Sequence, residues 1–294
     1  GDSKLTYLGY SYGTAIGAAY LDQFPTRVRA MVLDGALDPR LTWDGFLRGQ
    51  SAGFDGALNA FLDHCAHSDC AFRDAVSGDL GKAFDDLAAR VDAHSLPGDG
   101  SRRVGPDEFT LGVGAGLYSR AYGWPAIADA LAGAERGDGS QLLALSDSYL
   151  ERGDHGYANL TEANFAVNCV DRPWPRTEQP YYDLAAQVAR TSPRFGPAIA
   201  LSGLGCIAWP TPATGRPHAV TAPGSPPVVV IGTTRDPATP YAWAQALAAQ
   251  LSNGVLLTHV GDGHTVYRVG APGCIQRPVN DYLVTLRAPE AARC

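Results

Sequence analysis

Lysine and long apolar runs are the two most obvious absences from this sequence. Only Lys4 and Lys82 of the 23 cationic residues are lysines, and the formal net charge of the 294-residue chain is -7. No basic cluster is present, so the charge balance argues against a nucleic acid or an anionic membrane surface as partner. No apolar run approaches the roughly 20 residues that a membrane-spanning helix needs. The 45% of hydrophobic residues is instead enough to bury a substantial core.

Residues 5–17 read as an apolar strand that runs through G-x-S-x-G directly into a helix. Gly9 and Gly13 flank Ser11 because a strand that turns sharply into a helix leaves no room for side chains beside the turn. Ser11 would then project above the sheet edge. The N–H of Tyr12, at the helix N-terminus, would face the same space and could stabilise an oxyanion there. The pattern predicts a nucleophilic serine with half of an oxyanion hole.

Two later segments offer an acid and a base. The β-branched run at residues 227–234 predicts a buried parallel strand, and Asp236 follows its C-terminal end. A second strand, expected at residues 255–260, leads into a turn that carries His264. Sites in open α/β sheets lie at the carboxyl ends of the strands, and the chain order Ser, Asp, His is the one that α/β-hydrolases use. We therefore expect the two side chains to meet Ser11 at one sheet edge.

These three residues fit a catalytic triad. His264 would take the proton of Ser11 as general base, and Asp236 would orient and charge-balance the imidazolium. This chemistry needs no metal and no organic cofactor. His259 is a competing base, but it falls inside the expected strand and ranks below His264. A turn serine, a helix-capping aspartate and a loop histidine are the structural alternatives, and the shared order and strand-end positions favour the triad.

Five stretches are informative beyond these single residues: 7–14 (YLGYSYGT), 31–39 (MVLDGALDP), 166–171 (AVNCVD), 234–240 (TRDPATP) and 261–265 (GDGHT). Together they resemble the secreted tripeptidyl aminopeptidases, which are serine exopeptidases of the α/β-hydrolase fold related to proline iminopeptidases. The resemblance runs over nearly the whole chain. It implies hydrolysis of a peptide bond near a free amino terminus, with release of a short peptide. The triad alone would serve an ester equally well.

A free α-amino group is most simply recognised by a carboxylate at a fixed distance from the nucleophile. Asp171 and Glu162 are candidates because they flank Cys169. A structural role is an equal alternative for Asp171, which could pair with the neighbouring Arg172. For Glu162 the favoured alternative is that it simply starts a helix.

The α/β-hydrolases that this chain resembles have several strands before the nucleophile, and a connecting loop there donates a second oxyanion N–H. Only ten residues precede Ser11. We therefore expect a missing N-terminal segment of the same fold, in the same chain or as a partner. Loss of one oxyanion donor typically costs about 10² to 10³ in turnover, so we expect the chain alone to be weakly active or inactive.

Nearly two hundred residues separate the strand expected at residues 28–33 from the strand at 227–234, too many for one crossover. We expect an α/β-hydrolase core of residues 1–43 and 217–294, with a helical cap domain of residues 44–216 inserted. The cap would roof the serine and select the substrate. Apolar spacing near 3.6, or a Thr-Pro start signal, predicts helices over residues 43–65, 80–94, 107–122, 125–136, 140–152, 181–191 and 241–251. Residues 192–227, rich in Pro and Gly, are expected to have little regular structure.

Six cysteines form an even set, which favours three disulfides and hence an exported protein, secreted or held in the cell envelope. The preference for arginine over lysine, together with abundant Ala, Gly and Pro, suggests a bacterial source. Fifteen pairings are possible, and the sequence alone does not choose among them. Proximity in the sequence favours Cys65 with Cys70. A bond between Cys274 and Cys294 would tie the C-terminal tail to the core. The pair then left is Cys169 with Cys206, and this pattern is similar to that of the family.

Residues 64–70 (HCAHSDC) offer an alternative, because their His, Cys and Asp side chains could hold zinc. Four ligands within seven residues are cramped, so a metal is disfavoured.

Two other functions stay open for the whole chain. One is an esterase or lipase with the same triad. The other is a non-catalytic α/β-hydrolase-fold binding protein, which is disfavoured because all three triad positions are filled.

Overall fold

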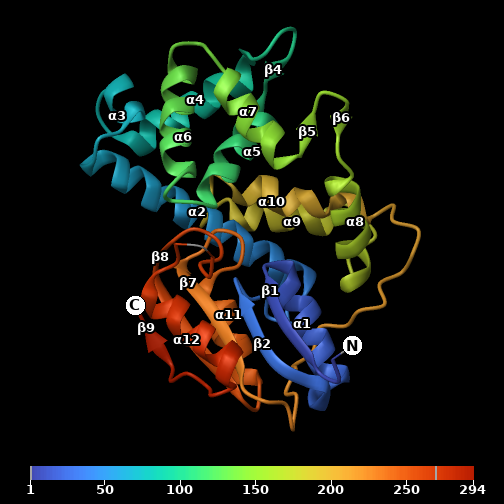
Figure 1. Cartoon of the computed structure of the whole chain (residues 1–294). Helices are drawn as coiled ribbons and strands as arrows, with labels where there is room; N and C mark the ends of the chain where they lie inside the picture. The colour runs from blue at the N-terminus through green and yellow to red at the C-terminus, as the bar shows by residue number, and fades with distance from the viewer. Residues whose placement is uncertain (1, 269) are drawn as a thin grey trace. The chain divides into compact units, whose positions relative to one another are not determined.

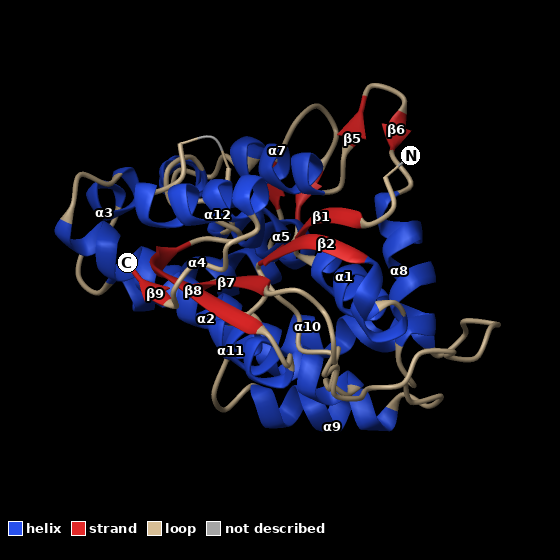
Figure 2. Ribbon diagram, turned by 60° about the horizontal axis from the view of Figure 1, so that its bottom comes forward, coloured by secondary structure: helices blue, strands red, loops and turns tan. Residues whose placement is uncertain are grey.

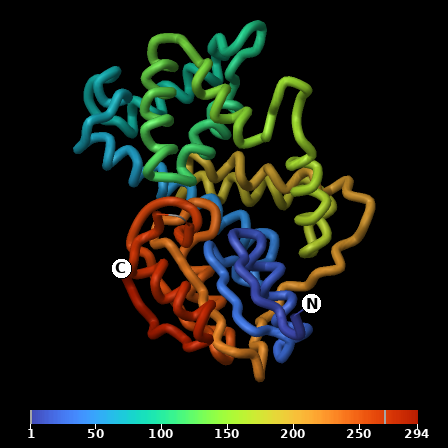
Figure 3. The backbone as a smooth tube through the Cα atoms, in the orientation of Figure 1, coloured from blue at the N-terminus to red at the C-terminus, as the bar shows by residue number. Residues whose placement is uncertain are grey.

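A computed structural model describes residues 2–268 and 270–294. The chain forms two compact units, one made of Gly1–Gly53 with Gly215–Cys294 and the other of Phe54–Thr214. In Figure 3 the blue start and the orange to red end of the tube wind together in the first unit, although they are far apart in the sequence. The role of the second unit as a cap stays a prediction.

A parallel sheet organises the first unit (Figure 1). Its five strands lie in the order β1-β2-β7-β8-β9, and every neighbouring pair is parallel. Because the strands run the same way, the carboxyl ends of the first four meet at one edge. Their bounds are β1 (Leu5–Tyr10), β2 (Val28–Asp34), β7 (Val228–Arg235), β8 (Gly254–Asp262) and β9 (Ala292–Arg293).

Helices cover both faces of the sheet (Figure 2). Leu21 and Leu247 pack with Met31 on one face, and Val279 packs with Val32 on the other. Strand β7 is buried on both sides over most of its length, which explains its continuous β-branched run. The helices of this unit are α1 (Tyr12–Gln23), α11 (Tyr241–Gln250), α12 (Gly273–Thr285) and the first part of α2 (Trp43–His67), with a 3₁₀ turn η1 at Pro25–Arg27.

The second unit is mainly helical and has its own core, in which Phe61, Leu87 and Ile127 are buried. Two short antiparallel ribbons accompany the helices. Its elements are the rest of α2, α3 (Ala71–Ala75), α4 (Leu80–Ala93), β3 (Leu96–Pro97), β4 (Arg103–Val104), α5 (Pro106–Leu117), α6 (Gly123–Glu135), α7 (Ser140–Tyr149), β5 (Arg152–Gly153), β6 (Gly156–Tyr157), α8 (Leu160–Asp171), α9 (Gln179–Val188), α10 (Gly196–Ser202) and η2 (Gly203–Cys206). None of the described helices has the length and apolar composition required to cross a membrane.

The expected α/β class is confirmed, and each expected strand and helix is present to within a few residues. Helix α12, which has Pro278 inside it, has no counterpart among the expected helices. Two expectations need correction. Residues 192–227, expected to have little regular structure, contain α10 and η2. The helix after Thr239 has Pro240 as its N-cap, while the Thr239 hydroxyl is bonded to other side chains.

Three disulfides are present, and they are the favoured pairs: Cys65 with Cys70, Cys169 with Cys206, and Cys274 with Cys294. The first of them uses both sulfurs of the suggested zinc cluster. Neither sulfur is then a thiolate, which is the form of cysteine that binds zinc. The third pair joins α12 to the C-terminal residue beside β9.

Candidate active site

Ser11 stands at the turn between β1 and α1, at the carboxyl end of the sheet. Its φ of 51° is unusual for a residue other than glycine. A Cβ on Gly9 would lie 2.5 Å from the carbonyl oxygen of Gly13, so the tight turn requires glycine there. A strained backbone held by its surroundings is typical of functional sites. This is the tight strand–turn–helix geometry that we expected around Ser11, and its role as nucleophile stays a prediction.

Two further contacts hold this turn. The Ser11 N–H donates to the carbonyl oxygen of Asp34 at 2.9 Å, and the Thr14 hydroxyl donates to the carbonyl oxygen of Ser11 at 2.6 Å. The Thr14 oxygen also accepts the N–H of Leu37 at 2.9 Å. The turn is therefore bonded to the segment that follows β2. Tyr12 is the first residue of α1, where its N–H would have to act as an oxyanion donor.

Asp236 and His264 are bonded to each other. Both carboxylate oxygens lie 2.9 Å from Nδ1 of His264, and the two residues are only 2% and 8% exposed. The carboxylate also accepts the N–H groups of Ala238 and Thr239 at 2.9 Å each, and the Thr239 hydroxyl at 3.0 Å. A carboxylate beside Nδ1 favours the tautomer with the proton on that nitrogen, which leaves Nε2 as the basic atom.

Gly35 connects the two halves of the site. Its φ is +68°, and a Cβ there would lie 3.0 Å from Cε1 of His264 and 2.9 Å from the Cγ2 methyl of Thr265. The preceding residue, Asp34, accepts the N–H of Ser11 through its carbonyl oxygen. The Asp34-Gly35 segment thus contacts both the serine turn and the histidine ring. Assignment of the three residues as a triad remains a prediction.

Asp34 itself was not singled out from the sequence. It is fully buried, and its carboxylate accepts the N–H groups of Val266 and Tyr267. Burial raises the pKa of Asp34 to about 6, although the two N–H bonds and the nearby His264 oppose this shift. The available signal was an aspartate at the end of an otherwise apolar strand.

An ion pair joins the ends of β7 and β8, the strands that lead to Asp236 and His264. Arg235 precedes Asp236, and its guanidinium donates to the carboxylate of Asp262, with one contact at 3.0 Å. The Asp262 side chain is only 3% exposed, whereas that of Arg235 is 45% exposed. The competing base His259 lies within β8, where burial lowers its pKa.

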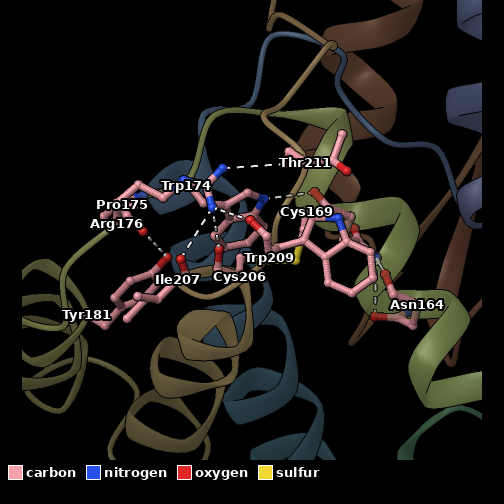
Figure 4. Close-up of a disulfide and its surroundings, with 11 residues drawn as sticks. Asn164, Cys169, Trp174, Pro175, Arg176, Tyr181, Cys206, Ile207, Trp209 and Thr211 are labelled. Atoms are coloured by element: carbon pink, nitrogen blue, oxygen red, sulfur yellow. Dashed lines mark hydrogen bonds between the residues drawn. A yellow bond between two sulfur atoms is a disulfide. The ribbon is translucent and has the colours of Figure 1, made fainter.

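The expected substrate anchors lie on α8, in the second unit. Glu162 is exposed in the first turn, where a carboxylate complements the helix dipole, and Asp171 is the half-buried last residue. The C-terminal end of α8 is firmly held. The disulfide to Cys206 fixes Cys169, and Trp174 Nε1 donates to the carbonyl oxygen of Asn168 at 2.8 Å (Figure 4). An anchoring role for either carboxylate stays a prediction.

Arg176 contributes to the same region and was missed from the sequence. Its Nη1 donates to the carbonyl oxygens of Trp209 at 2.6 Å and of Cys206 and Ile207 at 3.3 Å each (Figure 4). The guanidinium fixes the turn after η2, beside the disulfide partner of Cys169. The region near Asp171 therefore has the rigidity that a recognition site requires.

The comparisons with known proteins agree with this geometry. A family described as "TAP-like protein" matches residues 192–294. Serine protease Hip1 of Mycobacterium tuberculosis is 39% identical over 310 residues, covering 100% of this chain and 58% of that protein. Carboxylesterase B of the same species is 37% identical, covering 93% of this chain and 53% of the relative. Tripeptidyl aminopeptidase of Streptomyces lividans is 32% identical, covering 98% and 53%.

The chain thus spans a little over half the length of the relatives it matches. The similarity extends over both compact units, and the strand order with a serine elbow is that of the α/β-hydrolase sheet. Residues 192–294 thus match the TAP-like family, and the whole chain is similar to hydrolases of that kind with the α/β-hydrolase fold.

Proposed function

We propose that this chain carries the catalytic centre of a serine exopeptidase that cleaves near a free amino terminus and releases a short peptide. The main support is the buried Asp236–His264 pair. The imidazole of His264 lies beside Gly35, and the preceding residue, Asp34, accepts the N–H of Ser11. Its peptidase character rests on the relatives named serine protease and tripeptidyl aminopeptidase.

In the proposed reaction, Oγ of Ser11 attacks the scissile carbonyl and Nε2 of His264 takes the hydroxyl proton. The tetrahedral oxyanion is stabilised by the N–H of Tyr12, and Asp236 balances the imidazolium charge. The imidazolium then protonates the leaving amine. A water activated by neutral His264 hydrolyses the acyl-enzyme, which returns the proton to Ser11. In these steps His264 carries each proton, while Asp236 and the N–H of Tyr12 stabilise the charges that form.

Mass analysis of products tests the exopeptidase proposal. The protein is incubated with a peptide that has a free amino terminus and with its acetylated twin. We expect a short N-terminal fragment from the free peptide and at least tenfold slower cleavage of the acetylated one. Equal cleavage of both, or cleavage at internal sites, would contradict it. Labelling by a fluorophosphonate probe, compared with Ser11→Ala, checks separately that Ser11 is activated.

The anchor proposal is tested by Asp171→Asn. If the carboxylate binds the α-amino group, the variant loses its preference for the free peptide over the acetylated one, mainly through a higher KM. Asp154→Asn is the control in the same unit, because its carboxylate is exposed, and Glu162→Gln tests the second candidate anchor in the same way. An unchanged preference in Asp171→Asn assigns that residue a structural role.

An esterase with the same site is the second candidate, since one relative is named carboxylesterase B. The two are separated by comparing an acyl ester with a tripeptidyl amide at equal concentration. The peptidase is supported if kcat/KM favours the amide after correction for the higher intrinsic reactivity of the ester.

We also propose that the protein is exported, because three disulfides persist in oxidising compartments.

A further inference from the structure

Asp34 is the last residue of β2 and is bonded on two sides of the site. Its carbonyl oxygen accepts the N–H of Ser11 at 2.9 Å. Its Oδ2 accepts the N–H of Val266 at 2.8 Å and that of Tyr267 at 2.7 Å. Val266 and Tyr267 are the second and third residues after His264 in the chain. One residue therefore bonds both the nucleophile turn and the loop that carries the base.

The histidine loop needs such support. Gly263 and Thr265, on either side of His264, have φ values of 100° and 59°. A β-branched residue is strained in that conformation and keeps it only when its surroundings hold it there. The bonds from Asp34 begin at the next residue, Val266. Hydrogen bonds from N–H groups to a carboxylate are short and roughly twice as strong as neutral ones.

We propose that Asp34 is a positioning residue, whose ionised carboxylate holds the His264 loop in register with the Ser11 turn. The proposal rests on the proposed function for its effect on catalysis. Asp34 does not act on substrate. It acts through the amides of Val266 and Tyr267, so its loss affects where the imidazole stands. A displacement of about 1 Å in such a constellation can cost about 10² in rate.

The ionisation of Asp34 makes this role dependent on pH. Oδ1 is buried and has no hydrogen-bond partner among the residues that the structure describes. Burial raises the pKa of Asp34, and the carboxylate of Asp236 adds to the rise, while the two amides and His264 lower it, with a net value of about 6. Among the described residues, the phenol of Tyr10 is a further titratable group that interacts with Asp34, and Tyr10 in turn is near Arg268. Protonation would weaken the acceptor for both amides.

The acid limb of the pH profile tests the proposal. Protonation of Asp34, whose pKa is about 6, would add an inactivating step to the wild-type profile, so log kcat/KM should fall more steeply on the acid side than in a variant that cannot ionise at this position. Asp34→Asn keeps an oxygen acceptor and cannot ionise. We expect a shallower acid limb in this variant and a kcat at pH 7.5 that is about tenfold lower, with KM changed less than twofold. Asp34→Leu, which has no acceptor, should lose about 10² or more in kcat.

Asp55→Asn is a matched control. Asp55 is also buried, accepts the backbone N–H groups of Phe195 at 2.7 Å and Arg194 at 3.3 Å, and has a pKa raised by burial. It lies in the other unit, so its substitution should leave the slope of the acid limb unchanged. An acid limb that is as steep in Asp34→Asn as in the wild type, or an equal loss of slope in both variants, overturns the proposal.

A second measurement does not depend on catalysis. The backbone amide signals of Val266 and Tyr267 should titrate with a midpoint near pH 6 in the wild-type protein and stay constant in Asp34→Asn. Hydrogen exchange at both amides should be faster in the variant. If these changes occur while Ser11 fails to react with a fluorophosphonate, the proposed function is wrong and the role of Asp34 in holding the loop stands. If the amides do not respond to the substitution, the proposal about Asp34 is wrong.

Discussion

Asp236 and His264 are 28 residues apart in the chain, and both oxygens of the carboxylate lie 2.9 Å from Nδ1 of the imidazole. The pair is buried, and donors from Ala238 and Thr239 fix the carboxylate from the other side. An imidazole held in this way can neither rotate nor change tautomer without breaking a charged hydrogen bond.

Asp236→Asn should therefore reduce kcat by roughly 10³ to 10⁴ with little effect on folding, because the amide favours the wrong tautomer of His264. The measurement is kcat at pH 7.5 with a tripeptidyl substrate. Asp22→Asn is the control, since Asp22 also contacts a histidine, His218, at 3.0 Å, and that pair is exposed. A fall of less than tenfold in Asp236→Asn would exclude the triad.

The ion pair between Arg235 and Asp262 should couple the acid and base loops. A double-mutant cycle with Arg235→Met and Asp262→Asn isolates the pair in the free energy of unfolding. We expect a coupling free energy of about 1 kcal/mol. This is more than an exposed pair contributes, because Asp262 is buried, and less than a fully buried pair contributes, because Arg235 is half exposed.

The control cycle uses Lys82 and Asp86, a pair at i and i+4 whose side chains are 73% and 54% exposed. It should give about 0.5 kcal/mol or less. Equal coupling in the two cycles, measured by urea unfolding, would show that the Arg235–Asp262 pair is an ordinary surface contact.

The strands, most helices and the Asp236–His264 contact could be predicted because each depends on local signals. Continuous β-branched runs occur where a strand is buried on both faces, and a polar residue just beyond such a run points to the sheet edge. The structure brings Asp236 and His264 together because β7 and β8 are adjacent parallel strands. Because the two strands are parallel, the residues that follow their carboxyl ends lie at the same sheet edge and can contact each other.

The residues that hold the site could not be predicted in this way. Asp34 accepts hydrogen bonds from amides more than two hundred residues away, and Arg176 donates to the carbonyl oxygens of Cys206, Ile207 and Trp209. Side-chain bonds to distant backbone leave no periodic trace in a sequence, because the partner is a backbone carbonyl acceptor or N–H donor, and nearly every residue has both. Thr239 shows the same limit, since its sequence context favours a helix cap and its hydroxyl instead serves Asp236 and His264.

Gly35 should not tolerate a side chain. Alanine there would combine an unfavourable φ of +68° with a Cβ only 3.0 Å from the His264 ring and 3.1 Å from the Thr239 hydroxyl. Gly35→Ala should therefore destabilise the fold by about 1 kcal/mol or more and lower kcat by at least tenfold.

Gly224→Ala separates these two effects. Gly224 has φ of +81°, and the nearest atom to a Cβ there is 3.6 Å away, so the variant has the backbone strain without the crowding. It should lose stability and keep its kcat. If the two variants have the same kcat, as measured on samples shown to be folded by circular dichroism, Gly35 does not position His264.

The buried carboxyl of Asp34 should also make stability depend on pH. Its pKa is raised to about 6 in the folded protein, chiefly by burial, and an unfolded aspartate has a pKa of about 3.9. The native state therefore holds this proton more tightly, and the associated stability is complete below about pH 4 and lost as the pH rises through 6. A difference of two pKa units corresponds to about 3 kcal/mol.

Asp34→Asn removes this pH-dependent contribution to stability. Relative to the wild type, the variant should gain about 3 kcal/mol in free energy of unfolding between pH 4 and pH 7.5, as measured by urea unfolding at each pH.

Asp38→Asn is the control, and its free energy of unfolding relative to the wild type should change with pH in the opposite direction. Burial alone would raise the pKa of Asp38, but hydrogen bonds from Arg40 and Gln250 lower it below its usual value. Its carboxylate contributes stability above the unfolded pKa, so its loss costs more as the pH rises. Parallel trends in the two variants would contradict this assignment, whereas opposite trends together with a lower kcat in Asp34→Asn would show that the site keeps a buried charge at a cost in stability.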